Sequence, residues 1–404
     1  MSLVSWEKQA MTSLMGKSKK AVAQASDVIV ERLPFTPETL KTLQEKAAKD
    51  MLPSVVAKMG EDALLLSSRD LLTSSHHRMT AGPLIKEGGE ITVDGVKAAV
   101  LHADPGFTEI DASKVTVAIL DSGMDVSHQA FEGRVVKPFN VFDKSENVAD
   151  VLGHGTFVAG VVGGAAEGVA PSVKLMPVKI TDDAGNMGPR QVAEGIYYAV
   201  DNGAQIINMS LGGPAPKTLG PEALAELAEF EKAVKYARDK NVLLVSVSGN
   251  DGRKNVKYFP SDFEGILNVG AVNRIAENGG NGINHRPFYS NYGDRLDLVA
   301  PGTAQAAIPG GGMKKSSGTS VAAPHVSGAA ALVLAQNPTW TADQIADHLK
   351  RAVNDLGPKG KDPGFGYGQL NIQKAVYGTN LPEVPAAPRS KGVFGWLKER
   401  LGLG

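Results

Sequence analysis

The stretch Gly318-Thr319-Ser320-Val321-Ala322-Ala323-Pro324-His325-Val326-Ser327-Gly328 decides how the rest of the chain is interpreted. It places a serine at the start of a run of small residues, 321–335, that we expect to form a closely packed helix. At a helix N-terminus the serine lies among unpaired backbone N–H groups and the positive end of the dipole. This position suits negative charge that develops on a substrate. Serine is also a favoured helix cap, so the stretch alone leaves both roles open.

The apolar segments from about residue 112 onward predict an α/β fold. Strand-like and helix-like segments alternate, which favours a parallel sheet with helices on its faces. The expected strands are 115–120, 175–180, 205–209, 242–247 and 266–272, and the expected helices are 155–162, 190–201, 221–240, 321–335 and 342–353. We therefore expect three layers with a mostly parallel central sheet, preceded by a small N-terminal α/β extension.

The chain divides into four segments by composition. Residues 1–26 are polar and lysine-rich, and 27–102 form the extension, which includes a hairpin expected around Asp94-Gly95. The main domain is expected at 103–380. The tail, 381–404, combines a Pro/Ala-rich linker with a short amphipathic helix. That helix either docks on its own domain or makes a weak membrane contact.

Composition excludes several classes of function. With 42 basic and 43 acidic residues among 404, no global field attracts nucleic acid. The absence of cysteine removes disulfides, thiolate catalysis and cysteine-based metal sites. No apolar run approaches the roughly 20 residues that span a bilayer, and no apolar signal region opens the chain, so we expect a cytoplasmic protein. His76 and His77 lie in a loop-like segment without a third ligand at helical spacing, so we expect a solvated loop there.

Three residues at the ends of expected elements can act together. Asp121 follows the strand 115–120, His154 lies between two glycines before a helix, and Ser320 starts another helix. In open α/β sheets, ligands bind at the carboxyl ends of strands. Serine needs a base to accept its proton, and a histidine base needs a carboxylate to fix its tautomer. Taken singly, the three residues are equally well explained as a turn former, a loop residue and a cap.

A fourth element follows the strand 242–247, in Ser248-Gly249-Asn250-Asp251-Gly252. The side chain of Asn250 can donate a hydrogen bond to a tetrahedral oxyanion, together with the backbone N–H of Ser320. An asparagine in a glycine-rich turn is common, and alone it would be interpreted that way.

Together these stretches resemble the subtilisin-like serine peptidases. The motifs are Asp121-Ser122-Gly123-Met124-Asp125, Gly153-His154-Gly155-Thr156-Phe157-Val158-Ala159-Gly160 and the opening stretch. Their chain order, Asp then His then Ser, is the subtilisin order among the triad families. The resemblance extends from about residue 103 to 377 and does not cover 1–90 or the tail.

The resemblance implies a serine endopeptidase that acts through an acyl-enzyme on protein or peptide substrates, without a required cofactor. It implies a triad of Asp121, His154 and Ser320, with Asn250 in the oxyanion hole. The implied substrate-binding residues are Ser210, Leu211 and Gly212 on one edge, which pair with extended substrate, Gly185 and Asn186 on the opposite edge, and Val247 and Ser248 along the pocket for the residue before the scissile bond. No charged residue is clearly placed at the base of that pocket, so we expect broad specificity with an apolar or mixed preference.

Departures from the family pattern limit the resemblance. The segment 162–168 is short and holds one carboxylate, whereas calcium takes six to eight oxygens, so we expect no calcium at the usual loop after the catalytic histidine. A calcium site elsewhere stays open. Val321 replaces the methionine that usually follows the nucleophile. The extension is either a prosegment removed by self-cleavage, as in a zymogen, or a permanent accessory domain. A peptide cyclase or transpeptidase on the same fold and a non-catalytic peptide-binding homologue remain the alternatives.

Overall fold

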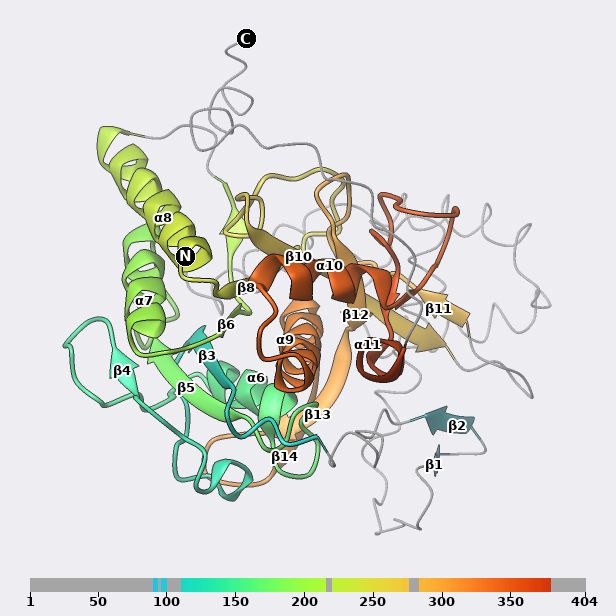
Figure 1. The fold of residues 1–404 in the computed structure, drawn as a ribbon, viewed down its shortest axis with the longest axis horizontal. Coiled ribbons are helices and arrows are strands. Elements are labelled where there is room, and N and C mark those ends of the chain that lie inside the picture. Colours follow the sequence, from blue (N-terminus) through green and yellow to red (C-terminus); the bar gives the residue numbers. More distant parts are fainter. Residues whose placement is uncertain (1–89, 94–95, 100–109, 216–219, 276–282, 379–404) are drawn as a thin grey trace, which may run out of the picture. The chain divides into compact units, whose positions relative to one another are not determined.

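The computed structural model describes residues 90–93, 96–99, 110–215, 220–275 and 283–378 (Figure 1). Strands β1 (Glu90–Val93) and β2 (Val96–Ala99) form a two-stranded sheet, as the predicted hairpin requires. The apolar run 99–101 predicts the second strand of this hairpin there, whereas the structure has it at Val96–Ala99. The rest of the extension, the histidine pair 76–77 and the tail with its predicted helix lie outside the described residues.

Most strands belong to one sheet, whose order is β15-β16-β12-β10-β8-β6-β3-β5-β4, with β11 paired to β10. Its strands are β3 (Thr116–Asp121), β4 (Phe139–Asn140), β5 (Lys174–Lys179), β6 (Ile206–Met209), β8 (Leu243–Val247), β10 (Ile266–Ile275), β11 (Ile283–His285), β12 (Leu298–Pro301), β15 (Val353–Asn354) and β16 (Gln369–Leu370). The pairings from β16 through to β4 are parallel, whereas β15 and β11 run antiparallel to their neighbours. This confirms the predicted mostly parallel sheet.

Helices cover both faces of this sheet because its strands are apolar on both sides. In β3, Val117 and Ile119 belong to one hydrophobic cluster, whereas Ala118 and Leu120 belong to the other. The first cluster contains residues of α6 (His154–Gly163) and α9 (Thr319–Gln336), and the second contains residues of α7 (Pro189–Asp201) and α8 (Pro221–Asp239). Figure 1 shows α7 and α8 beside each other, apart from α6 and α9. The molecule therefore has the three predicted layers.

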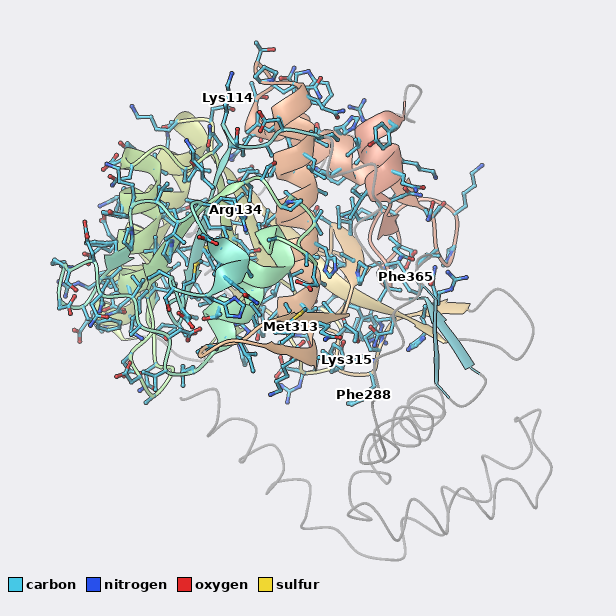
Figure 2. All side chains as sticks on the ribbon, turned by 90° about the horizontal axis from the view of Figure 1, so that it is seen from below. Lys114, Arg134, Phe288, Met313, Lys315 and Phe365 are labelled. Atoms are coloured by element: carbon cyan, nitrogen blue, oxygen red, sulfur yellow. The ribbon has the colours of Figure 1, made fainter. Side chains whose placement is uncertain are left out.

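Smaller elements complete the described part of the chain. They are the 3-10 helix η3 (Gln129–Phe131), helices α10 (Ala342–Arg351) and α11 (Ile372–Tyr377), the antiparallel pair β7 (Gly213–Pro214) and β9 (Tyr258–Phe259), and the hairpin of β13 (Thr303–Ala307) and β14 (Met313–Ser317). The sequence did not predict β7, β9 or the β13–β14 hairpin. Met313 and Lys315, labelled in Figure 2, show why: β14 is largely exposed and polar, so it carries no apolar alternation. None of the helices in the described ranges is long and apolar enough to cross a bilayer.

The order of the central strands decides which segments meet at the carboxyl edge of the sheet. Strands β8, β6, β3 and β5 are consecutive neighbours. The segments at or directly after their ends are 248–250, 210–212, 121–122 and 180–186, so all four emerge side by side. This edge is the starting point of every segment with a predicted substrate or catalytic role, except the segments of His154 and Ser320.

Candidate active site

Asp121 and His154 form a hydrogen-bonded pair in which the carboxylate is buried and the imidazole is partly exposed. Asp121 is the last residue of β3, and its side chain is 2% exposed. His154 is the first residue of α6, and its Nδ1 lies 2.7 Å from Asp121 Oδ1. A carboxylate can only accept, so Nδ1 carries the proton and Nε2 is left as the basic nitrogen. The same Oδ1 also accepts from the backbone N–H of Ser122 at 2.7 Å, which fixes the carboxylate.

The surroundings shift the titration of the imidazole. Burial lowers the pKa of His154, but the charge of Asp121, the hydrogen bond to it and the charge of Asp150 raise it by more. The pKa of His154 therefore lies above its ordinary value. Since only a neutral imidazole accepts a proton, basic catalysis by His154 is lost as the pH falls through this raised pKa.

Asp150 organises the start of α6, and no pattern in the sequence indicated this role. Its carboxylate is buried and accepts four hydrogen bonds: from Ser122 Oγ (2.8 Å), Gly153 N (2.8 Å), Thr156 N (2.8 Å) and Thr156 Oγ1 (2.6 Å). Ser122 Oγ in turn accepts from Gly155 N at 2.9 Å. An anion at a helix N-terminus is favourable, because it satisfies N–H groups that have no partner within the helix. Asp150 thus fixes the turn that carries His154 against the segment that carries Asp121.

Glycine lets these two segments approach closely. A methyl group on Gly155 would lie 2.1 Å from the carbonyl oxygen of Gly123 and 3.1 Å from Cβ of Asp121. The first distance is an impossible overlap with backbone, so residue 155 has to be glycine here. Gly155 thus allows the start of α6 to approach the backbone of the segment after Asp121.

Ser320 and Asn250 meet at the start of α9. Ser320 is half-buried in the first turn of the helix. A methyl group on Gly318 would lie 3.1 Å from Ser320 Oγ and 3.5 Å from Asn250 Nδ2, so both polar atoms face the same spot. Asn250 Oδ1 accepts from Thr319 N and from Thr319 Oγ1, each at 2.9 Å. Because these donors fix the oxygen, Nδ2 is turned away from Thr319 and toward that spot.

Asn291 holds the loop that presents Asn250, and the sequence did not indicate this. Its side chain is almost fully buried. Oδ1 accepts from the backbone N–H groups of Asp251 (3.1 Å) and Arg253 (2.9 Å), and Nδ2 donates to Ser248 O (2.9 Å) and to the carboxylate of Asp251 (3.0 Å). The loop 248–253 is therefore fastened at several points by one side chain that lies about 40 residues away in sequence.

The predicted substrate-binding segments lie where the strand order places them. Val247 ends β8 and Ser248 follows it, both buried, and Ser210, Leu211 and Gly212 follow β6. Asn208 Nδ2 donates to Ser210 Oγ (2.9 Å) and Ser327 Oγ donates to Asn208 Oδ1 (2.8 Å), so this segment is tied to α9.

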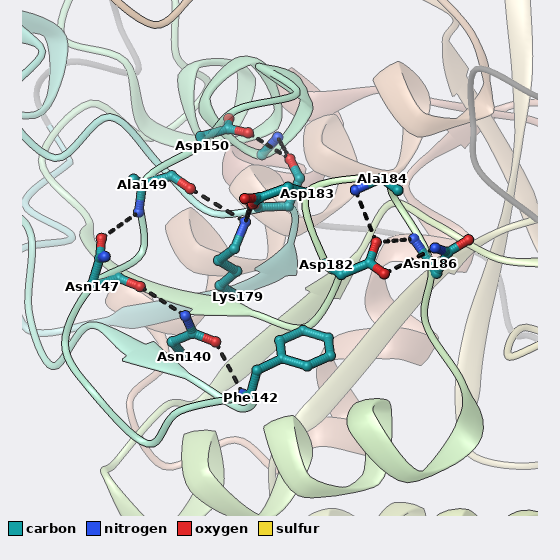
Figure 3. A network of polar contacts seen from close by, with 12 residues as sticks. Asn140, Phe142, Asn147, Ala149, Asp150, Lys179, Asp182, Asp183, Ala184 and Asn186 are labelled. Atoms are coloured by element: carbon teal, nitrogen blue, oxygen red, sulfur yellow. Dashed lines mark hydrogen bonds and ion pairs between the residues drawn. The ribbon is translucent and has the colours of Figure 1, made fainter.

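Gly185 and Asn186 lie on the other side of β3, in a turn closed by Asp182 (Figure 3). Asp182 accepts from Asn186 N (2.8 Å) and Asn186 Nδ2 (2.9 Å), and these bonds lower the pKa of Asp182. Nearby, the buried Lys179 donates to the carbonyls of Ser122 (2.8 Å) and Ala149 (3.3 Å) and pairs with a surface aspartate, Asp183. Lys179 therefore joins the end of β5 to the segment after Asp121.

His154 and Ser320 are not hydrogen-bonded to each other in the described structure. Such bonds are commonly long in unliganded enzymes and tighten when substrate binds. The described ranges also hold no cluster of three or more His, Asp or Glu side chains placed to bind a metal. The arrangement thus offers an oriented histidine, a half-buried serine at a helix start and a fixed amide donor, which suit acyl transfer.

Comparison with known proteins agrees with this chemistry. The model of the subtilase family matches residues 112–368. Subtilisin NAT from Bacillus subtilis subsp. natto is 32% identical over 381 residues, which cover 91% of this chain and 88% of that protein. Alkaline elastase YaB from Bacillus sp. (strain YaB) is 36% identical over 306 residues, 72% of this chain and 73% of that one. The crystal structure of a cold-adapted subtilisin-like serine proteinase superposes with a TM-score of 0.54 at 30% identity, over 65% of this chain and 89% of that one.

Proposed function

The chain belongs to the subtilase family and is a serine endopeptidase, and from this premise we propose that Asp121, His154 and Ser320 are its catalytic triad. The 2.7 Å bond between His154 Nδ1 and Asp121 is the observation that carries the proposal. It leaves Nε2 free to take the proton of Ser320 Oγ as that oxygen attacks the substrate carbonyl. Asp121 then stabilises the imidazolium that forms.

Asn250 Nδ2 and the backbone N–H of Ser320 are the proposed donors to the oxyanion. The support is that Thr319 fixes Asn250 Oδ1, which aims Nδ2 toward the serine side. The early N–H groups of a helix lack intrahelical partners, and the dipole of α9 adds positive potential at this end. Donors fixed in advance cost no reorganisation when the charge develops.

The acyl-enzyme is then resolved by water. In the first half-reaction, His154 gives its proton to the leaving amine, which departs as the ester to Ser320 forms. In the second half-reaction, His154 takes a proton from water, which attacks the ester and releases the new carboxyl end. No step needs a cofactor. Calcium at the loop 162–168 is not expected, because that loop carries only one carboxylate.

We propose that extended substrate binds between Ser210–Gly212 and Gly185–Asn186, with Val247 and Ser248 beside the pocket for the residue before the scissile bond. The support is the strand order, because β6 and β5 flank β3, which carries Asp121. Substrate backbone can add to an exposed edge as a strand. Broad specificity with an apolar or mixed preference was the expectation from sequence alone.

The test is hydrolysis of a casein-like substrate by purified wild type and two variants. Ser320→Ala should lose at least about 10,000-fold in turnover, since the nucleophile is absent. Asn250→Ala should lose about 100- to 1000-fold, a range taken from the corresponding donor of a subtilisin. Asn202→Ala, at the far end of α7, is the control and should keep wild-type rates. Full activity in Ser320→Ala would refute the triad.

Product masses separate the reaction types. Hydrolysis adds one water to each cleaved bond, whereas a cyclase or transpeptidase returns products without it. A serine-directed covalent inhibitor should block the reaction and add its mass to the wild type but not to Ser320→Ala.

A further inference from the structure

Tyr258 lies at the junction of two segments to which the proposed function assigns substrate binding. It begins β9, which pairs antiparallel with β7 so that Pro214 lies opposite Tyr258 and Gly213 opposite Phe259. Strand β7 directly continues the segment Ser210–Gly212. Tyr258 as a whole residue is only 7% exposed, and it belongs to the same hydrophobic cluster as Val247.

The aromatic ring is wedged between Gly212 and Gly249. A methyl group on Gly212 would lie 2.8 Å from Tyr258 Cε1, and one on Gly249 would lie 2.3 Å from Cε2 and 2.5 Å from Cζ. Cε1 and Cε2 are the opposite edges of the ring at its hydroxyl end. The outer end of the ring therefore fills the space between the two walls, and both walls need glycine there to admit it.

Backbone contacts keep the ring in this place. Tyr258 N donates to Asp262 Oδ2 at 3.1 Å, and Asp262 N donates back to Tyr258 O at 2.9 Å. Together with the β7–β9 pairing, these bonds fix the point from which the side chain projects. Burial, and after it the charge of Asp251, raise the pKa of the Tyr258 hydroxyl, so it stays neutral and adds no charge to the space between the walls.

We propose that Tyr258 closes the pocket for the residue before the scissile bond and restricts that residue to small side chains, namely glycine, alanine or serine. This rests on the proposed function, which puts Val247 and Ser248 beside that pocket and Gly212 along the bound substrate, and it takes the adjacent Gly249 as part of the same wall. A substrate with phenylalanine or leucine there would overlap the ring, and a pocket already filled by protein discriminates against large side chains by that clash. The inference narrows the broad preference expected from sequence.

The test uses two chromogenic peptides that differ only in the residue before the scissile bond, alanine in one and phenylalanine in the other. Both compete for the same enzyme, so the ratio of their kcat/KM values does not depend on how much enzyme is folded. Wild type should prefer the alanine peptide by at least about 10-fold. Tyr258→Ala should shift the ratio toward phenylalanine by about 10- to 100-fold, because it opens space for the larger ring. Tyr258→Phe, which keeps the ring, is the matched control and should retain the wild-type ratio.

Each outcome decides the proposal. If Tyr258→Ala slows both peptides by the same factor, Tyr258 is an ordinary core residue and the inference is wrong. A second test needs only the wild type. Mass spectrometry of a casein digest identifies the residue at each new carboxyl end, which is the residue before the cleaved bond. Cleavage that depends on Ser320 but falls mostly after large residues would overturn the inference and leave the proposed function intact. Casein cleavage that does not need Ser320 would overturn the proposed function itself.

Discussion

At the scale of single residues, we expect Asp150 to affect the reaction through His154 rather than through contact with the substrate. It accepts four hydrogen bonds at the start of α6, and its charge is among the causes that raise the pKa of His154. An amide cannot replace it, because one of its two ends would face donors with another donor. Asp150 is therefore a positioning residue for His154.

Asp150→Asn should lower kcat/KM by up to about 100-fold, the cost of a small displacement of a catalytic group. Removal of the negative charge should also lower the pKa of His154. Since His154 must be neutral to act as a base, the acid limb of the kcat/KM profile should move to lower pH. The measurement is the pH dependence of kcat/KM for the variant beside wild type and the exposed control Asp143→Asn. An unchanged acid limb would contradict the electrostatic part of this role.

Val321 is a second single residue that matters, because it affects how sensitive the activity is to oxidation. It follows Ser320, is 1% exposed and packs with Phe157, Val161 and Ala306. A thioether beside the nucleophile would be open to oxidation, which turns an apolar side chain into a polar one. The wild type has no thioether at position 321. Among the described residues, the most exposed methionine is Met313, which lies on the β13–β14 hairpin.

Dilute peroxide should therefore leave most of the wild-type activity intact while it oxidises Met313. Val321→Met should become sensitive under the same conditions, and Val321→Leu should stay resistant. Residual activity is followed with time, and oxidation is located by peptide mapping. Rapid loss in the wild type that disappears when another methionine is replaced would show that the sensitive site lies elsewhere.

At the scale of elements, Arg134 secures the end of helix α6. Its guanidinium donates to the carbonyl oxygens of Gly163, the last residue of the helix, and of Ala130 and Val173 (Figure 2). The last carbonyls of a helix lack intrahelical partners and carry the negative end of the dipole, so a cation there is favourable. One side chain thus joins α6, η3 and the start of β5.

Arg134→Met keeps the aliphatic stem but leaves these carbonyls without their donor. Hydrogen bonds from charged groups contribute about 1.5–3 kcal/mol each, and part of this is recovered by water, so the free energy of unfolding should fall by roughly 1–3 kcal/mol. Denaturant unfolding of the variant measures this against wild type. The exposed Arg190→Met is the control, and an equal loss in both variants would mean that the carbonyl contacts contribute little.

The sequence predicted regular elements far better than the contacts between them. Strands and helices with clear apolar periodicity were predicted within three residues of their ends, as with 190–201 for α7 (Pro189–Asp201). Catalytic candidates were recognisable because each lies directly at the end of such an element. The sequence did not indicate the proposed role of Tyr258 or the contacts of Asn291, because both depend on pairings across about 40 residues of chain, which no local pattern encodes. Asp150 was missed for a different reason, since it caps α6 from outside the cap position, Gly153.

At the scale of the whole molecule, the strand order β8-β6-β3-β5 explains why one site draws on segments spread over some 200 residues. Parallel strands send their carboxyl ends to one edge, so each crossover returns the chain to the same place. Helices α6 and α9 begin beside that edge and contribute His154 and Ser320. The proposed catalytic groups therefore need the complete sheet to come together, and no isolated part of the chain contains the proposed site.

The N-terminal extension, residues 27–102, is either removed by the enzyme itself or kept in the mature protein. The match to subtilisin NAT covers 91% of the chain, a share that cannot be reached without part of residues 1–102. We propose that the enzyme cleaves its own chain within 73–106 and so releases the extension. The composition of 73–90 supports this, because segments rich in small and polar residues are preferred sites of cleavage.

Self-cleavage makes the length of the purified protein depend on its own nucleophile. Intact mass should show a shortened wild type, whose new N-terminus lies within 73–106. Ser320→Ala should keep its full length. Addition of a trace of wild type to Ser320→Ala then tests whether one molecule can cut another, since the variant should shorten only when active enzyme is present. If both proteins purify at full length and wild type still digests casein, the extension is a permanent accessory domain. If both shorten equally, another protease makes the cut and the extension is removed without self-cleavage.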